Sequence, residues 1–299
     1  MPFPRAVDYH KPGRPEVPNG LGVFYVLASS AYLFALYASH AFWGFPGEEV
    51  ASGALPLACC LLFGGFLGLL DDWMDLRWRY KALTPLVASL PLVALRQGHP
   101  VMATYIFGKV NFGVLYYLLI VPTIVTVTTN VVNQLGGLNG LETLCPLTVM
   151  VGLLAATLLG PAKAVNKSAA LLLIVPILAL AALAALNFAG RVFVGNVGSF
   201  SFGITLAAYA IIANVEQALL IAILPYVAHA SLVLLNYFIW RRLPALKLTP
   251  EGLLYAEHRR SLQTLLAYKR PVSERRLVLE ITGLFALSSA LAVLATLLS

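Results

Sequence analysis

The sequence predicts an all-α fold, a polytopic membrane helix bundle of about nine transmembrane helices. Hydrophobic residues make up 60% of the 299 residues and charged residues only 11%, whereas a soluble domain carries roughly 25% charged residues. Nine apolar segments come close to the roughly 20 residues that a helix needs to cross a bilayer. No composition shift marks a soluble domain, so we expect residues 1–299 to form a single integral membrane domain.

The predicted spans follow one another with mostly short connections. They lie at 19–43, 50–70, 82–97, 113–131, 141–160, 168–187, 198–213, 216–239 and 279–298, and 82–97 and 198–213 are the shortest. The connection 98–112 is punctuated by glycine and proline, which predicts a turn or a small hairpin. A long basic loop, 240–278, separates the last two spans, and we expect it on the cytoplasmic side. Either an amphipathic surface helix attracted to anionic lipid or a lid over a nucleotide would fit this loop.

The positive charge orients the predicted bundle. With a cytoplasmic N-terminus, nine alternating spans place all but four of the 20 Lys and Arg residues on the cytoplasmic side, as the positive-inside rule requires. The net charge of +7 thus lies along a membrane surface, which argues against nucleic acid as a partner. The cysteine spacing predicts neither a disulfide framework nor a zinc site. Membrane lipid is therefore the expected surroundings of most of the chain.

Three of the four aspartates lie in one cytoplasmic segment, "DDWMDLRWRYK" at 71–81. On a helix end, Asp71 and Asp75 share a face, and Asp72 is turned about 100° away. A solvated helix terminus beside cationic neighbours is one interpretation of such a group. Two adjacent carboxylates at a membrane surface also suit a proton-abstracting base or a site for Mg²⁺ and phosphate. The carboxylates alone leave both interpretations open.

Two further polar segments follow outward-to-inward spans. "NVVNQLGGLNGLE" at 130–142 has amides one helical turn apart, which either bind a neighbouring helix or, with backbone freed by glycine, hold a base, a sugar or a metal. "FVGNVGSFSFG" at 193–203 enters a span through glycines, and the N–H groups of a helix start offer a seat for phosphate. All three segments converge on the cytoplasmic face, where we expect the functional site.

In their order, "DDWMDLRWRYKALTPLVASLPL", "NVVNQLGGLNGLE" and "RVFVGNVGSFSFG" resemble the polyprenyl-phosphate N-acetylhexosamine-1-phosphate transferases. The similarity is greatest to the dolichyl-phosphate N-acetylglucosamine-phosphotransferases of eukaryotes and archaea, and it extends from about His10 to Arg242. It implies transfer of N-acetylhexosamine-1-phosphate, with GlcNAc-1-phosphate favoured, from a UDP-sugar to a membrane polyprenyl or dolichyl phosphate. UMP is released, and lipid-linked glycan assembly begins.

The same resemblance implies Mg²⁺ as cofactor and an active site on the cytoplasmic face, and it favours an archaeal plasma membrane over the endoplasmic reticulum. The family usually has ten spans, the first of them ahead of the region that corresponds to "DYHKP". Only a short stretch precedes that region here, which agrees with the nine spans expected. The oligomeric state is open between a monomer and a homodimer.

The resemblance also assigns roles to single residues. Asp71 and Asp72 match paired catalytic aspartates that orient or deprotonate the lipid phosphate. The implied substrate-binding residues are Lys81 for phosphate, Asn133 as a nucleotide or structural amide, Phe193 for stacking on uracil and Arg242 for pyrophosphate or sugar. The implied metal residues are Asn139 and Asn196.

Asn196 stands where the family typically has an aspartate that binds Mg²⁺. An amide supplies a dipole instead of a full charge, and a unit charge beside a divalent ion is worth on the order of several kcal/mol. One interpretation is an active enzyme whose Mg²⁺ arrives on the donor pyrophosphate. A weakened or inactive relative retained for binding, or an engineered substitution in an active parent, is a second. A multi-spanning transporter of a lipid-linked or nucleotide cargo is a third.

Overall fold

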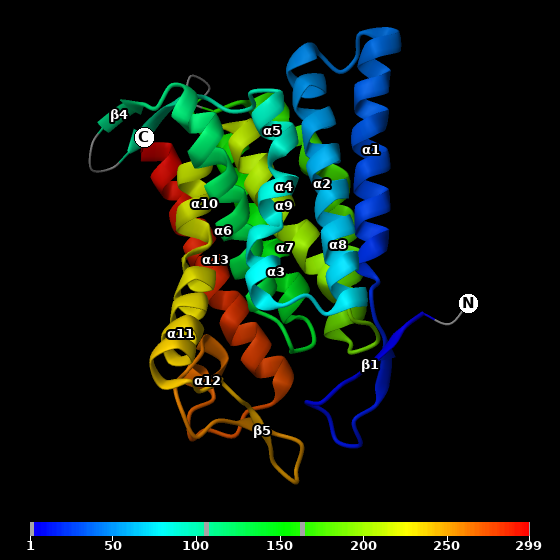
Figure 1. The fold of residues 1–299 in the computed structure, drawn as a ribbon, viewed down its shortest axis with the longest axis vertical. Coiled ribbons are helices and arrows are strands. Elements are labelled where there is room, and N and C mark those ends of the chain that lie inside the picture. Colours follow the sequence, from blue (N-terminus) through cyan, green and yellow to red (C-terminus); the bar gives the residue numbers. More distant parts are fainter. Residues whose placement is uncertain (1–2, 105–107, 162–164, 299) are drawn as a thin grey trace.

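In the computed structural model, which describes residues 3–104, 108–161 and 165–298, long helices run side by side along one axis (Figure 1). They are α1 (Gly22–Trp43), α2 (Glu48–Met74), α6 (Val121–Gln134), α7 (Leu141–Leu159), α8 (Ile174–Phe188), α9 (Gly195–Ala213) and α13 (Glu274–Leu298). The π-helix η1 (Tyr116–Ile120) leads into α6, and the 3₁₀-helix η2 (Lys167–Leu173) leads into α8. The prediction of an all-α polytopic bundle is confirmed.

Not all of the predicted spans are single unbroken helices. Within the described residues, seven helices are long and apolar enough to cross a membrane, and a bent pair makes eight if it is counted as one span. That pair is α10 (Glu216–Ala222) and α11 (Leu224–Trp240), which meet at 55°. Pro225 lies in the first turn of α11, and a proline has no N–H to continue the preceding helix.

The predicted span 82–97 is not a single helix. It consists of α3 (Trp78–Leu83), α4 (Pro85–Ala88) and α5 (Leu90–Ala94), which stack one above another along α2 (Figure 1). Pro85 and Pro91 lie in the first turns of α4 and α5, where they end the helix that precedes them. This predicted span is therefore present as three short helices, beside the seven or eight longer spans of the described residues.

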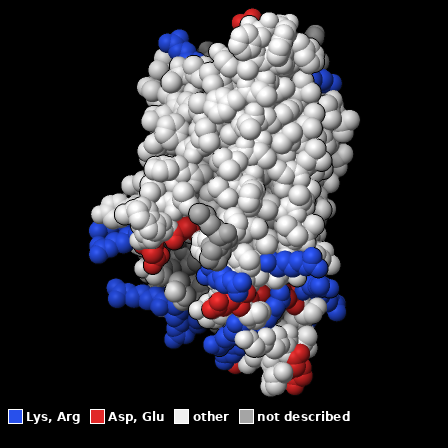
Figure 2. Space-filling view, turned by 90° about the vertical axis from the view of Figure 1, so that its right-hand side faces the viewer, with Lys and Arg blue, Asp and Glu red and all other residues white. Residues whose placement is uncertain are grey.

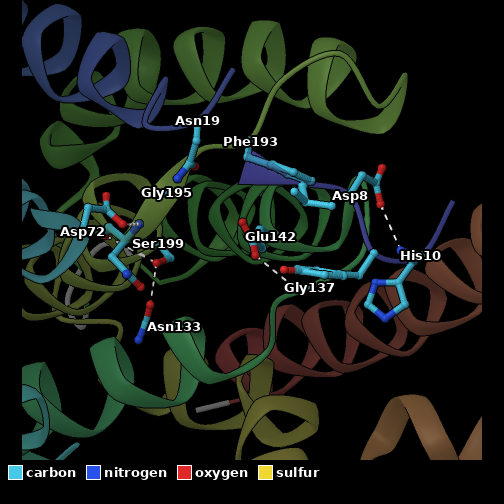
Figure 3. Close-up of a pocket in the computed structure, with 13 residues that line it drawn as sticks. Asp8, His10, Asn19, Asp72, Asn133, Gly137, Glu142, Phe193, Gly195 and Ser199 are labelled. Carbon is cyan, nitrogen blue, oxygen red and sulfur yellow. Dashed lines mark hydrogen bonds between the residues drawn. The ribbon is translucent and has the colours of Figure 1, made fainter. Parts of the chain in front are cut away.

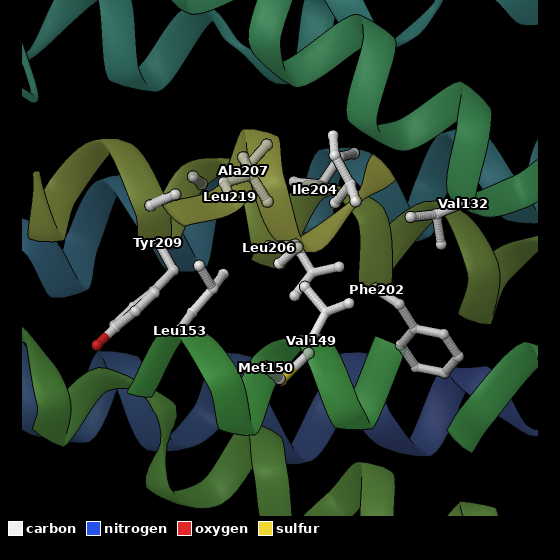
Figure 4. Packing of buried hydrophobic residues seen from close by; sticks show 14 of the residues in the cluster. Val132, Val149, Met150, Leu153, Phe202, Ile204, Leu206, Ala207, Tyr209 and Leu219 are labelled. Atoms are coloured by element: carbon white, nitrogen blue, oxygen red, sulfur yellow. The ribbon is translucent and has the colours of Figure 1, made fainter. Parts of the chain in front are cut away.

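The predicted short span 198–213 is the most deeply enclosed helix among those that could cross a membrane: α9 is 94% buried over its apolar window. Its Phe202, Leu206 and Tyr209 face residues of α7 in Figure 4. A helix that is apolar on all sides belongs inside a bundle. Close packing also needs small residues, because a Cβ added to Gly198 would lie only 3.2 Å from the Cα of Gly22 in α1. The start of α9 is thereby fixed at one end of the bundle.

Three short antiparallel hairpins complete the fold. β1 (Arg5–Val7) and β2 (Glu16–Pro18) precede α1, and β3 (Val101–Thr104) pairs with β4 (Gly108–Asn111), which confirms the hairpin predicted in 98–112. Residues 240–278, which we call the basic lobe, contain β5 (Lys247–Leu248), β6 (Leu254–Tyr255) and α12 (Leu262–Leu266). The lobe buries Leu254, Ala256 and Ala267 completely. The lobe is therefore a small folded unit rather than a long amphipathic helix.

Charge is concentrated at one end of the molecule. Figure 2 shows Lys, Arg, Asp and Glu gathered at the lower end, a broad band of uncharged surface above them and a few charged side chains at the top. The β1–β2 hairpin and the basic lobe lie at that same lower end in Figure 1. An uncharged band between two polar ends is the surface that a bilayer requires.

Candidate active site

A pocket of about 310 Å³ opens at the charged end of the bundle (Figure 3). This volume is at the lower end of the range for small-molecule sites. Its lining residues are Val7, Asp8, Tyr9, His10, Asn19, Asp72, Asn133, Gly137, Glu142, Phe193, Gly195, Asn196 and Ser199. The β1–β2 hairpin and all three polar segments singled out in the sequence contribute to it.

One side of the pocket is lined by Asp72 and Asn196, which Asp71 and Lys81 adjoin. We call these four residues the charged wall. Asp71 is buried, and its carboxylate forms an ion pair with the Lys81 ammonium. Lys81 Nζ also donates to Asn196 Oδ1 at 3.1 Å. A buried carboxylate is costly unless it is paired, so this contact compensates Asp71. The contacts of Lys81 connect the C-terminal ends of α2 and α3 to the start of α9.

Asp72 has a different environment from its neighbour. It is exposed to the pocket, and its two oxygens accept the backbone N–H groups of Asn196 at 2.8 Å and Val197 at 3.0 Å. These N–H groups belong to the first turn of α9, where a helix lacks internal acceptors and has a positive dipole end. The Asp72 carboxylate thus lies where the sequence predicts a seat for phosphate.

Glycine at position 195 makes that arrangement possible. Gly195 has a φ of +70°, a backbone conformation that side-chain-bearing residues rarely adopt. A Cβ there would also lie 2.7 Å from Asp72 Oδ2. The glycine therefore allows the Asp72 carboxylate to approach the start of α9.

Two further residues of the predicted substrate set, Asn133 and Phe193, line the pocket. Asn133 Oδ1 accepts the Ser199 hydroxyl at 2.6 Å, which ties the end of α6 to α9. Phe193 is half-buried, and its backbone N–H donates to Pro18 O at 2.8 Å. Asn130, by contrast, donates to backbone carbonyls of Ala82 and Thr126. It therefore has the helix-binding role that the sequence left open, whereas Asn133 faces the pocket.

On the opposite side the pocket is lined by Gly137 and Glu142. We call these two residues, together with their neighbours Gly136 and Asn139, the glycine wall. Gly137 has a φ of +90°, and its N–H donates to Glu142 Oε1 at 3.0 Å. Asn139 is buried, and its side-chain amide donates to Asp8 Oδ2 at 2.7 Å and to Glu274 Oε1 at 3.0 Å. The Asn139 backbone N–H donates to the same Glu274 oxygen at 2.8 Å. The N-terminal hairpin and α13 therefore hold this wall.

The structure brings most of the predicted site residues together. Asp72, Asn133, Phe193 and Asn196 line the pocket, and Asp71 and Lys81 adjoin it through the Lys81–Asn196 hydrogen bond. Asn139 and Arg242 are not among the lining residues. Asn139 is the buried member of the glycine wall, and Arg242 is exposed after the C-terminal end of α11.

Sequence reasoning missed several pocket residues. These are Asp8, Tyr9, His10 and Asn19 around the N-terminal hairpin, together with Glu142 and Ser199. The hairpin residues carry no spacing signal in a polar, proline-rich stretch. Glu142 could have been found, because a carboxylate at the start of a helix, next to a glycine-rich turn, is well placed to accept backbone N–H groups.

The pocket fits a hard cation only in part. Asp72, Asn133 and Asn196 offer oxygen atoms, the ligand type that Mg²⁺ prefers. Among the residues that the structure describes, no three His, Cys, Asp or Glu side chains come together as a metal site. Mg²⁺ commonly binds through one or two carboxylates plus substrate phosphates and water. The donor set agrees with that mode, with Asp72 as the carboxylate.

Comparison with known proteins identifies the family. Residues 54–214 match glycosyl transferase family 4. A Dictyostelium discoideum UDP-N-acetylglucosamine–dolichyl-phosphate N-acetylglucosaminephosphotransferase is 26% identical over 74% of this chain and 62% of its own. A Saccharolobus solfataricus protein provisionally given the same name is 30% identical over 96% of this chain and 86% of its own.

A Streptococcus uberis phospho-N-acetylmuramoyl-pentapeptide-transferase is also similar, at 32% identity over 76% of this chain and 68% of its own. The resemblance drawn from the three motifs is thereby confirmed, including its eukaryotic and archaeal members. The matched range contains the charged wall up to Asn196 and the whole glycine wall. The chain therefore belongs to glycosyl transferase family 4.

Proposed function

We propose that this protein transfers GlcNAc-1-phosphate from UDP-GlcNAc to a membrane polyprenyl or dolichyl phosphate and releases UMP. The main support for this proposal is the pocket. The three motif segments of a family 4 chain meet there, at the charged end of an apolar bundle. The names of the Dictyostelium and Saccharolobus relatives support the donor and the acceptor. The charge distribution supports an active site on the cytoplasmic face, and the similarity to the Saccharolobus relative supports an archaeal plasma membrane.

In this reaction an oxygen of the lipid phosphate attacks the β-phosphorus of the donor. The bond between that phosphorus and the bridging oxygen of UMP breaks, and UMP leaves with the electron pair. The product is a lipid diphosphate that carries the sugar. Such a transfer needs positioned groups and charge stabilisation more than a strong nucleophile.

The charged wall is suited to that task. Asp72 projects a carboxylate into the pocket, where it can orient the lipid phosphate or accept its proton. Lys81 is held between Asp71 and Asn196, so its ammonium is fixed beside the pocket for contact with phosphate. Asp72, Asn133 and Asn196 would hold Mg²⁺, which supplies charge neutralisation for the phosphate oxygens. Phe193 offers a flat apolar face on which uracil would stack.

The test is a release assay with purified protein in detergent or lipid nanodiscs. UDP-GlcNAc, Mg²⁺ and dolichyl phosphate should yield UMP, and omission of either the lipid phosphate or Mg²⁺ should abolish it. Other UDP-N-acetylhexosamines and shorter polyprenyl phosphates define the donor and the acceptor. Absence of UMP with every such donor and acceptor would contradict the proposal and leave a binding protein or a transporter. Cargo flux into sealed vesicles without chemical conversion would identify the transporter.

A further inference from the structure

A single peptide group in the glycine wall is held at both of its ends. The carbonyl oxygen of Gly136 accepts a hydrogen bond from Gln263 Nε2 at 2.7 Å. The N–H of Gly137, which belongs to the same peptide group, donates to Glu142 Oε1 at 3.0 Å. Gln263 comes from α12 in the basic lobe and Glu142 from the first turn of α7. Two elements far apart in sequence therefore fix the plane of this peptide.

This peptide group needs such restraint because glycine flanks it on both sides. Glycine populates positive and negative φ about equally and loses the most conformational freedom on folding. Gly137 and Glu142 both line the pocket, as Figure 3 shows. Rotation of the peptide would withdraw the Gly137 N–H from Glu142 and change the shape and polarity of the pocket wall.

Contacts within the basic lobe hold Gln263 in one position. Ser261 accepts the Thr264 N–H in a reciprocal capping box, which fixes the start of α12. Leu262 and Thr264, on either side of Gln263, are buried. The lobe also lies against the N-terminal hairpin, because a Cβ added at Gly252 would be 3.1 Å from Pro12 Cγ. The lobe therefore contacts two separate parts of the pocket surroundings without lining the pocket.

We propose that Gln263 is a positioning residue for donor binding, acting through the Gly136–Gly137 peptide group. The proposal rests on the proposed function, since it takes the uridine diphosphate moiety as the group that meets the glycine wall. Among the residues that the structure describes, the hydrogen bonds and the ion pair of the charged wall join α2, α3 and α9 and do not involve Gln263. Loss of the Gln263 hydrogen bond should therefore weaken donor binding and leave the chemical step nearly unchanged.

The experiment compares Gln263→Ala with Gln263→Lys, which keeps an N–H donor on a longer side chain. Gln263→Ala should raise the KM for UDP-GlcNAc about fivefold to tenfold, the effect of one lost hydrogen bond, with kcat within about twofold. Gln263→Lys should recover at least half of that effect. Lys247→Ala is the matched control, because Lys247 lies in the same lobe and pairs with exposed Glu257, and neither residue lines the pocket. It should change neither constant.

Amide hydrogen exchange, measured over two regions, distinguishes a positioning role of Gln263 from a general loss of folding. Amide hydrogen exchange over residues 134–142 should increase in Gln263→Ala, whereas exchange over the start of α9 should not. An unchanged KM, or a fall in kcat and Tm without a rise in KM, would overturn the proposal. Absence of extra exchange over 134–142 would overturn it as well.

Binding of UDP, measured by calorimetry without any acceptor, separates this proposal from the transfer reaction. If the parent protein binds UDP but releases no UMP, the proposed transfer fails. Weaker UDP binding by Gln263→Ala than by Lys247→Ala would then still support the positioning role. Equal UDP affinity of the two variants, including no measurable binding by the parent, would overturn it.

Discussion

The two walls of the pocket are held in different ways. In the charged wall, Asp71, Asp72, Lys81 and Asn196 bond to one another and to the start of α9, so the connections stay between neighbouring helices. The glycine wall is held from outside its own helices, by the N-terminal hairpin, the basic lobe and the start of α13. One pocket therefore combines a charged side held between neighbouring helices with a side whose shape depends on remote segments.

We expect substitutions in the two walls to have different kinetic effects. Interactions made only in the transition state change kcat, whereas interactions made equally with bound substrate change KM. Changes in the charged wall should therefore appear mainly in kcat or in the metal requirement. Changes that loosen the glycine wall should appear mainly in the KM for the donor.

The largest effect is expected for Asp72→Asn. The substitution keeps the shape of the side chain but removes the charge, and its NH₂ group would face a backbone N–H at the start of α9. We expect kcat for UMP release to fall about 100-fold or more, the usual contribution of a proton acceptor in a transferase site. Asp75→Asn is the matched control in the same segment, because Asp75 is exposed and does not line the pocket. Equal losses in both variants would contradict the assignment.

The second prediction concerns the buried ion pair. Lys81→Met leaves the Asp71 carboxylate buried without its partner, which should lower the free energy of unfolding by about 3 kcal/mol. The double variant Asp71→Asn/Lys81→Met removes both charges and should recover most of the Tm in a detergent melt. UMP release should stay low in both variants. Recovery of activity in the double variant would show that the pair serves stability alone.

Asn196→Asp tests whether the missing negative charge at the proposed Mg²⁺ site limits metal binding. Its carboxylate would add a full negative charge beside Asp72 and Lys81. The Mg²⁺ concentration for half-maximal activity should fall about tenfold, equivalent to roughly 1.4 kcal/mol of metal binding. Asn133→Asp gives a second carboxylate in the same pocket for comparison. An unchanged Mg²⁺ requirement together with unchanged activity would contradict the role given to Asn196.

The smallest effect is expected at Glu274, which holds the glycine wall through Asn139. Glu274→Ala removes the acceptor of two hydrogen bonds and should raise the KM for UDP-GlcNAc about fivefold. Glu274→Gln keeps an acceptor oxygen and should restore most of the affinity. A fall in kcat with no change in KM would group Glu274 with the charged wall. It would contradict the different kinetic effects expected for the two walls.

The fold was predictable where hydropathy alone decides it. The apolar segments became helices, and α9 is enclosed because it is apolar on every side. Pro85, Pro91 and Pro225 are visible in the sequence, but the packing that keeps α3, α4 and α5 stacked along α2 is a tertiary property. The basic lobe could not be predicted, since its core of Leu254, Ala256 and Ala267 depends on pairing between residues without a helical or strand period.

The site was predictable in its charged wall and less so in its glycine wall. Asp71, Asp72 and Lys81 lie within one short segment, so their meeting with Asn196 required only that two segments share one end of the bundle. Asn139 follows Gly137, whose positive φ decides where the next side chains point. Its partners Asp8 and Glu274 are more than 130 residues away in the chain. No local sequence pattern predicts a contact between residues so far apart.

In the proposed reaction, the β-phosphorus of the donor is transferred to an oxygen of the lipid phosphate. The most direct measurement uses UDP-GlcNAc labelled with ³²P in the β-phosphate, Mg²⁺ and dolichyl phosphate, followed by separation of lipid and water phases. We expect the label to enter the lipid phase together with the sugar, while an equal amount of unlabelled UMP appears in water. Label that stays in water as UDP, with the sugar alone on the lipid, would contradict the proposed reaction.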